Sequence, residues 1–178
     1  KDNLVLQADP GAGTITGVTM NRCIVVDAFS TTASHSQGIY ASGVDSLLIE
    51  ECVFDHNGWS ETVPAAATGF NHNQYINSCT NVTLRGNLVL RASSQGTKLS
   101  TESAVDFDTL LVDNCCYIEG EIGVGAGGNE AGSFRFINFT VKDCVMMWMG
   151  RAQPTGGDLG WFIVFKDQDG GLIEGNLL

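Results

Sequence analysis

The feature that most constrains the fold is a six-residue pattern that recurs six times along the 178-residue chain. Each copy reads apolar, any residue, apolar, polar, small or polar, and then Cys or Asn. The copies occupy residues 18–23, 47–52, 82–87, 110–115, 139–144 and 171–176. Their last residues are spaced 29, 35, 28, 29 and 32 positions apart. A recurrence of about 30 residues is typical of solenoids, in which stacked repeats share one continuous core.

Alternation within each copy predicts strands, because apolar and polar residues take turns with a period of two. No segment shows a sustained period of 3.6 residues, as a helix would require. We therefore expect an all-β fold, a parallel β-helix (solenoid) of about six coils, with one repeat per coil and strand-like spacing between coils. The alternative is an antiparallel β-sandwich, which leaves the recurring Cys/Asn position unexplained.

The Cys/Asn positions predict a ladder of side chains that face inward on successive coils. Asn can satisfy backbone groups at a bend, and Cys is a small apolar filler. The cysteine spacing follows the repeat and not a metal-binding pattern, so we expect buried free thiols. A disulfide is the alternative, since stacked coils bring Cα atoms within reach, although parallel side chains suit it poorly. The ladder residues are Cys23, Cys52, Asn87, Cys115, Cys144 and Asn176.

Residues 38–40, 81–87 and 172–176 resemble the repeats of right-handed parallel β-helix proteins. That superfamily includes pectate and alginate lyases, polygalacturonases, uronan epimerases and phage tailspikes. The resemblance covers about residues 14–178 and implies a right-handed, single β-helix domain over residues 1–178, found outside the cell or on a cell or virion surface. It is weak for activity, because one fold hosts many functions. Since neither end carries a polar cap, we expect a part of a longer protein, or ends that pair with a second copy as a homo-oligomer.

The charge of the chain argues against nucleic acid as a partner. The formal net charge is −11, and a strongly acidic surface repels phosphate backbones. No apolar run approaches the length of a membrane span, so we expect no membrane partner. Residues 62–101 nevertheless contain three basic side chains and no Asp or Glu. This acid-free segment predicts a site for an anionic ligand, unless the imbalance is an accident of composition.

The strongest candidates for catalysis lie in that segment. His72, Tyr75 and Lys98 resemble a recurring β-helix pattern, His-Asn-x-Tyr-Ile followed a coil later by Gly-x-x-Lys, although only Thr97 separates Gly96 from Lys98. These residue types suit β-elimination on a uronic-acid polymer, in which Lys or His removes a proton and Tyr protonates the leaving oxygen. Arg91 would neutralise the substrate carboxylate. In the alternative interpretation Tyr75 only stacks on Tyr40, which holds the same repeat position.

A second set of candidates would bind sugar rings. Four residues after each ladder position lies a row of mixed charge: Asp27, His56, Arg91, Glu119 and Trp148. Trp148, with Trp59 nearby in the long insertion 58–71, could stack on a sugar, and loops inserted between solenoid strands often build a site. The alternative is a solvated face with neighbouring salt bridges.

Two acidic motifs complete the survey. Asp106 and Asp108 lie on one face of a strand, as the paired carboxylates of glycoside hydrolases do, but an ion pair between Asp106 and Arg135 is the plainer interpretation. Residues 167–171 resemble an acidic calcium loop without its later Glu, so calcium is the only cofactor suggested and no metal ligand is assigned. We therefore expect a carbohydrate-active module, a lyase on an anionic polysaccharide. The alternatives are a non-catalytic adhesin or tailspike-like module and a structural spacer.

Overall fold

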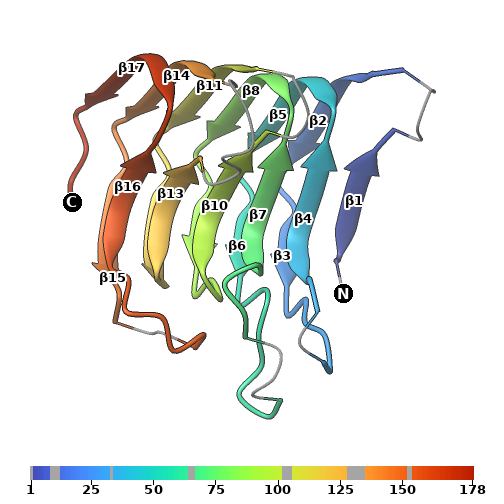
Figure 1. Ribbon diagram of the computed structural model, residues 1–178, viewed down its shortest axis with the longest axis vertical. Coiled ribbons are helices and arrows are strands. Elements are labelled where there is room, and N and C mark those ends of the chain that lie inside the picture. Colours follow the sequence, from blue (N-terminus) through green and yellow to red (C-terminus); the bar gives the residue numbers. More distant parts are fainter. Residues whose placement is uncertain are drawn as a thin grey trace.

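Each repeat forms one coil of a parallel β-helix (Figure 1). The computed structural model describes residues 2–8, 13–32, 34–63, 67–101, 106–127, 135–151 and 154–178. Its strands form three sheets, and each strand pairs in parallel with the equivalent strands of the neighbouring coils. The predicted all-β parallel β-helix of about six coils is confirmed, and the antiparallel β-sandwich is wrong. The right-handedness of the coil stays a prediction.

The chain visits the three sheets in a fixed order, A, B and then C. Sheet A, at the front of Figure 1, contains β1 (Leu4–Gln7), β4 (Gln37–Ser42), β7 (His72–Asn77), β10 (Gln95–Ser100), β13 (Ile122–Ala126) and β16 (Trp161–Phe165). Sheet B contains β2 (Ile15–Asn21), β5 (Val44–Glu50), β8 (Thr80–Arg85), β11 (Phe107–Asp113), β14 (Phe136–Lys142) and β17 (Gln168–Glu174). Sheet C contains β3 (Ile24–Val26), β6 (Val53–Asp55), β9 (Leu88–Leu90), β12 (Cys116–Gly120) and β15 (Val145–Met149).

The turn from sheet B to sheet C has the same length, two residues, wherever both strands are present. Its first residue adopts a left-handed backbone conformation in each coil. Residues other than Gly, Asn and Asp rarely adopt this conformation. This conformation explains the small or polar residue at the fifth position of the repeat. The left-handed residues are Arg22, Glu51, Gly86, Asn114, Asp143 and Gly175, with φ of 55°, 52°, 61°, 51°, 53° and 65°.

The second residue of the turn is the Cys/Asn ladder position, and its side chain bonds to the backbone of the coil before it. Asn87 Oδ1 accepts a hydrogen bond from the Cys52 N–H at 3.0 Å, while its Nδ2 donates to the Ile49 carbonyl at 2.8 Å. Cys144 Sγ accepts from the Cys115 N–H at 3.4 Å. The predicted ladder is therefore confirmed on adjacent coils, and its sulfur atoms are acceptors as well as fillers.

All six cysteines are free thiols, which confirms that part of the prediction. Burial holds for Cys52, Cys115 and Cys144, whereas Cys23 in the first coil is exposed. Cys79, which lies outside the repeat, has the same role at the turn from sheet A to sheet B, where its Sγ accepts from the Val44 N–H at 3.4 Å. The residues two positions after the ladder are register partners on sheet C and stack in the core: Phe54, Val89, Tyr117 and Met146.

The connections from sheet C to sheet A vary most in length between coils, from one residue to sixteen. These connections span residues 27–36, 56–71, 91–94, 121 and 150–160. The longest, 56–71, confirms the insertion expected at 58–71. In Figure 1 the connections before β4, β7 and β16 all project from the same end of the sheets, next to sheet A. Their position places variable residues beside the outer face of that sheet.

We predict that Asn87→Ala lowers the free energy of unfolding by about 2–4 kcal/mol, because it leaves a buried N–H and a buried carbonyl without partners. Asn87→Cys should lose less than half as much, since a thiol fills the equivalent position in neighbouring coils. Urea unfolding of the two variants measures the difference. Equal losses would show that the ladder hydrogen bonds do not stabilise the turn.

Candidate functional site

Two rows of side chains run across the outer face of sheet A, from coil to coil. The core side of the sheet is filled by residues such as Ile39, Ile76 and Leu99, which are fully buried. The first outward row, in register, is Tyr40, Tyr75, Lys98, Gly125 and Val164. The second is Gln37, His72, Gln95, Ile122 and Trp161.

A pocket of about 140 Å³ lies over β7 and β10, where the predicted catalytic residues meet. His72, Tyr75, Gln95 and Lys98 form its floor, and the connections before β4 and β7 supply His35 and Phe70. The rings of His35 and Phe70 stack with centroids 5.6 Å apart and an interplanar angle of 27°. Two loops from different coils therefore join above the same patch of sheet.

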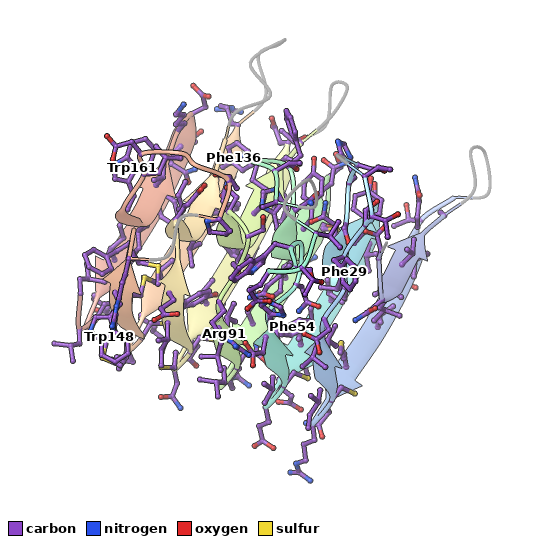
Figure 2. All side chains as sticks on the ribbon, turned by 90° about the horizontal axis from the view of Figure 1, so that it is seen from below. Phe29, Phe54, Arg91, Phe136, Trp148 and Trp161 are labelled. Atoms are coloured by element: carbon purple, nitrogen blue, oxygen red, sulfur yellow. The ribbon has the colours of Figure 1, made fainter. Side chains whose placement is uncertain are left out.

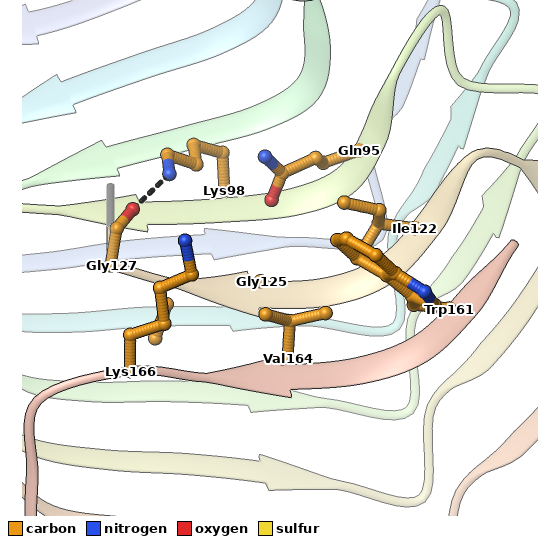
Figure 3. A pocket seen from close by; sticks show the side chains of 9 residues that line it. Gln95, Lys98, Ile122, Gly125, Gly127, Trp161, Val164 and Lys166 are labelled. Atoms are coloured by element: carbon orange, nitrogen blue, oxygen red, sulfur yellow. Dashed lines mark hydrogen bonds between the residues drawn. The ribbon is translucent and has the colours of Figure 1, made fainter. Parts of the chain in front are cut away.

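Pockets on either side extend this hollow. One of about 290 Å³ is lined by Asp2, His35, Gln37, Tyr40 and Tyr75. The other, of about 110 Å³, shares Gln95 and Lys98 with the central pocket and continues over β13 and β16 (Figure 3). Because neighbouring pockets share residues, together they form one shallow depression across the strands, which we call the sheet A groove.

The structure brings Lys98, His72 and Tyr75 together in the sheet A groove. Lys98 and Tyr75 are register partners on adjacent strands, and the His72 and Tyr75 rings are 5.5 Å apart, edge to face. Tyr75 also stacks on Tyr40 at 5.3 Å, so the expected aromatic pair is present, and Lys98 continues the same row. The Lys98 ammonium donates to the Gly127 carbonyl.

Thr97, the residue that makes the motif match imperfect, turns away from the groove. It is fully buried, and its hydroxyl donates to Gln74 Oε1 at 2.5 Å and lies 2.9 Å from the Tyr117 hydroxyl. This internal network holds β10 against β7 from the core side. Thr97 thus fixes the strand that presents Lys98 without itself meeting a ligand in the groove.

His72 is a buried, neutral side chain. It is 3% exposed, and its Nδ1 accepts a hydrogen bond from the Gln95 backbone N–H at 3.3 Å. Burial, with smaller electrostatic contributions from the neighbouring Lys98 and His35, lowers its pKa to about 3. The imidazole therefore has a structural role, since its hydrogen bond from Gln95 holds the first residue of β10 beside the groove.

Arg91, Trp59 and Trp148 are not among the described residues that line the groove. Arg91 follows β9 in a left-handed conformation and forms two 2.7 Å hydrogen bonds to Asp55, which raise the pKa of its guanidinium. Trp59 Nε1 donates to the Arg91 carbonyl at 2.9 Å. The row of residues four positions after the ladder therefore forms salt bridges between coils, as in the alternative interpretation. Contrary to the sequence prediction, Arg91 does not join Lys98 at the groove.

Trp148 is 55% exposed on β15 in sheet C, and the Arg151 guanidinium lies 5.0 Å from its ring centroid. Figure 2 shows Trp148 well separated from Trp161, which belongs to the groove. A sugar that stacks on Trp148 would therefore occupy a different face from one bound at Lys98.

The acidic motifs have structural partners. Arg135 contacts Asp106 at 3.8 Å, which confirms the expected ion pair, and Asp169 at 2.5 Å. Residues 168–171, expected in a calcium loop, instead belong to β17. The described part of the chain contains no group of three or more His, Cys, Asp or Glu side chains arranged to hold a metal ion.

The comparisons with known proteins give no relative. No family model, no curated protein and no solved structure matches the chain. Within the described residues there is no helix long and apolar enough to span a membrane. The groove must therefore be interpreted from its own chemistry.

Sequence reasoning missed the groove residues Trp161, Lys166, His35 and Phe70. All four lie outside the recurring six-residue pattern: Trp161 is in β16, Lys166 directly follows it, and His35 and Phe70 precede β4 and β7. Knowledge of the strand register would have identified Trp161, because Trp161 is the register partner of Ile122, which in turn is the register partner of Gln95.

We predict that His72 makes the protein less stable as the pH falls. An unfolded His takes up a proton near pH 6.5, whereas the folded His72 remains neutral until about pH 3, so stability is lost between these values. The loss between pH 7 and pH 5 should be about 2 kcal/mol. Urea unfolding of the wild type and His72→Gln at both values measures it. An equal pH dependence in the two proteins would contradict burial of a neutral imidazole.

Proposed function

We propose that this protein is a carbohydrate-active module that binds an anionic, uronic-acid polysaccharide in the sheet A groove and cleaves it by β-elimination. The observation that carries the proposal is the register of β7 and β10, which sets Tyr75 beside Lys98 in one outward row. A linear polymer could cross the strands along this row and contact several coils at once.

Charge supports an anionic ligand. Lys98, Lys166 and His35 line the groove, and Asp2 is the only acidic side chain among its described lining residues. The formal net charge of the chain is −11, so a polyanion is repelled elsewhere and attracted here. Carboxylates on other faces are engaged by arginines, as in the pairs Arg85–Asp113 and Arg135–Asp169.

The elimination requires three roles, which the groove residues can fill. Lys98, in its neutral amine form, accepts the proton from the carbon that carries the uronate carboxylate, and the electron pair forms a double bond as the glycosidic oxygen leaves. Tyr75 protonates that oxygen. Arg91 is paired with Asp55, so the positive charge that neutralises the substrate carboxylate comes instead from Lys166, which lines the pocket over β13 and β16.

The resemblance to the right-handed parallel β-helix superfamily supports the same proposal, since its lyases act on uronic-acid polymers. A surface or extracellular location follows from such a substrate. A non-catalytic, polysaccharide-binding role is the second candidate. It is favoured by His72, whose buried and neutral imidazole leaves the groove with one base fewer than the sequence predicts.

We predict that Lys98→Ala reduces elimination on a uronate polymer by 10²-fold or more, roughly the contribution of a general base. Arg135→Ala is the matched control, because it removes a positive charge from a salt bridge on sheet B. The ultraviolet absorbance of the unsaturated product measures the rate on alginate, pectate and glycosaminoglycans.

Binding separates the two candidate functions. If Lys98→Ala weakens binding, more so at low salt than at high salt, but the wild type releases no unsaturated product, then the module binds without cleaving. If Lys98→Ala and the wild type bind every anionic polymer equally at both salt concentrations, the sheet A groove is not the site.

A further inference from the structure

The end of the groove over β13 and β16 has a composition that differs from the rest. Its pocket of about 110 Å³ has apolar walls formed by Ile122, Val164 and Trp161, and two lysines at one side (Figure 3). The space is large enough to hold a substituent of a sugar.

An unused hydrogen-bond acceptor faces this pocket. Gln95 Oε1 is buried and accepts no hydrogen bond from the described residues. A buried amide oxygen without a donor is costly, and a ligand N–H or O–H that reaches it would recover that cost. Gly125 makes room for the end of this side chain, because a Cβ at that position would collide with Gln95 Oε1.

The lysines define the other half of the ligand. Lys98 and Lys166 extend toward the same side of the pocket in Figure 3, and no described lining residue of this pocket is acidic. Lys166 forms no salt bridge with an acidic side chain in the described part of the chain. An anionic group beside the apolar walls is the natural partner of this pair.

We infer that the pocket formed by Gln95, Ile122, Trp161, Val164 and Lys166 binds an acetamido group next to a carboxylate, so that the polysaccharide carries both in its repeat. The acetamido N–H donates to Gln95 Oε1, its methyl group contacts Ile122 and Val164, and the carboxylate pairs with Lys166. Trp161, which is half exposed, offers a ring face to the sugar. This inference rests on the proposed function and narrows its substrate from any uronate polymer to one with N-acetylated sugars.

Calorimetric titration with three oligosaccharides of equal length tests the inference. Hyaluronan carries both groups, oligogalacturonate only the carboxylate and chitin oligosaccharide only the acetamido group. We expect hyaluronan to bind about tenfold or more tighter than either of the others, because only hyaluronan supplies both an acetamido group for the acceptor and apolar walls and a carboxylate for Lys166.

Gly125→Ala provides the matched variant. The added methyl group displaces only the flexible end of Gln95, so the fold should persist while the affinity ratio of hyaluronan to oligogalacturonate falls toward one. Gln95→Leu, which removes the acceptor, should lower the ratio in the same way. Gly171→Ala is the control, because a Cβ there meets Phe139 O at an ordinary 3.5 Å on sheet B, and it should keep the ratio.

Each outcome decides a different claim. Equal affinity of the wild type for hyaluronan and oligogalacturonate overturns the acetamido pocket and leaves the proposed function standing. If neither hyaluronan nor oligogalacturonate binds, both the acetamido pocket and the proposed function are overturned. A ratio that persists in Gly125→Ala and Gln95→Leu, or that is lost in Gly171→Ala, places the preference outside this pocket and overturns the inference.

Discussion

The two-residue turn between sheets B and C is the constraint on which the remaining structure depends. A left-handed residue bends the chain from sheet B into sheet C, and the Cys or Asn that follows bonds to the backbone of the preceding coil. Because parallel coils can slide past one another, a side chain that bonds to one defined N–H fixes their register. Four of the six turns carry this left-handed conformation on a residue other than Gly, a backbone cost that is offset by an unambiguous stack.

Fixed register at that turn leaves the opposite side of each coil free to vary. The connections into sheet A range from one residue to sixteen, yet Tyr40, Tyr75, Lys98, Gly125 and Val164 remain in one row. A row of this kind can change its chemistry from aromatic to cationic to apolar over successive coils without disturbing the core. The sheet A groove is the result: its floor is set by register and its rim by loops such as 56–71.

The fold could be predicted from the sequence because the ladder recurs at a nearly constant spacing and each copy alternates. The meeting of Lys98 with Tyr75 could also be anticipated, since both lie in the acid-free segment one coil apart. Arg91 could not be placed, because its partner Asp55 belongs to another coil and spacing alone does not reveal the pair. Trp161 and Lys166 were missed because sheet A carries no repeated motif: the strand pairing aligns Trp161 with Gln95, and Lys166, just after β16, lines the same pocket as Lys98.

A crystal structure of the protein with a uronate oligosaccharide tests the central claim most directly, namely that register builds a binding groove on the outer face of sheet A. The account predicts a sugar chain that crosses β7, β10 and β13, with a carboxylate near Lys98 or Lys166 and the Tyr75 hydroxyl beside a glycosidic oxygen. A sugar chain seated instead on sheet B, or on Trp148 in sheet C, would contradict it.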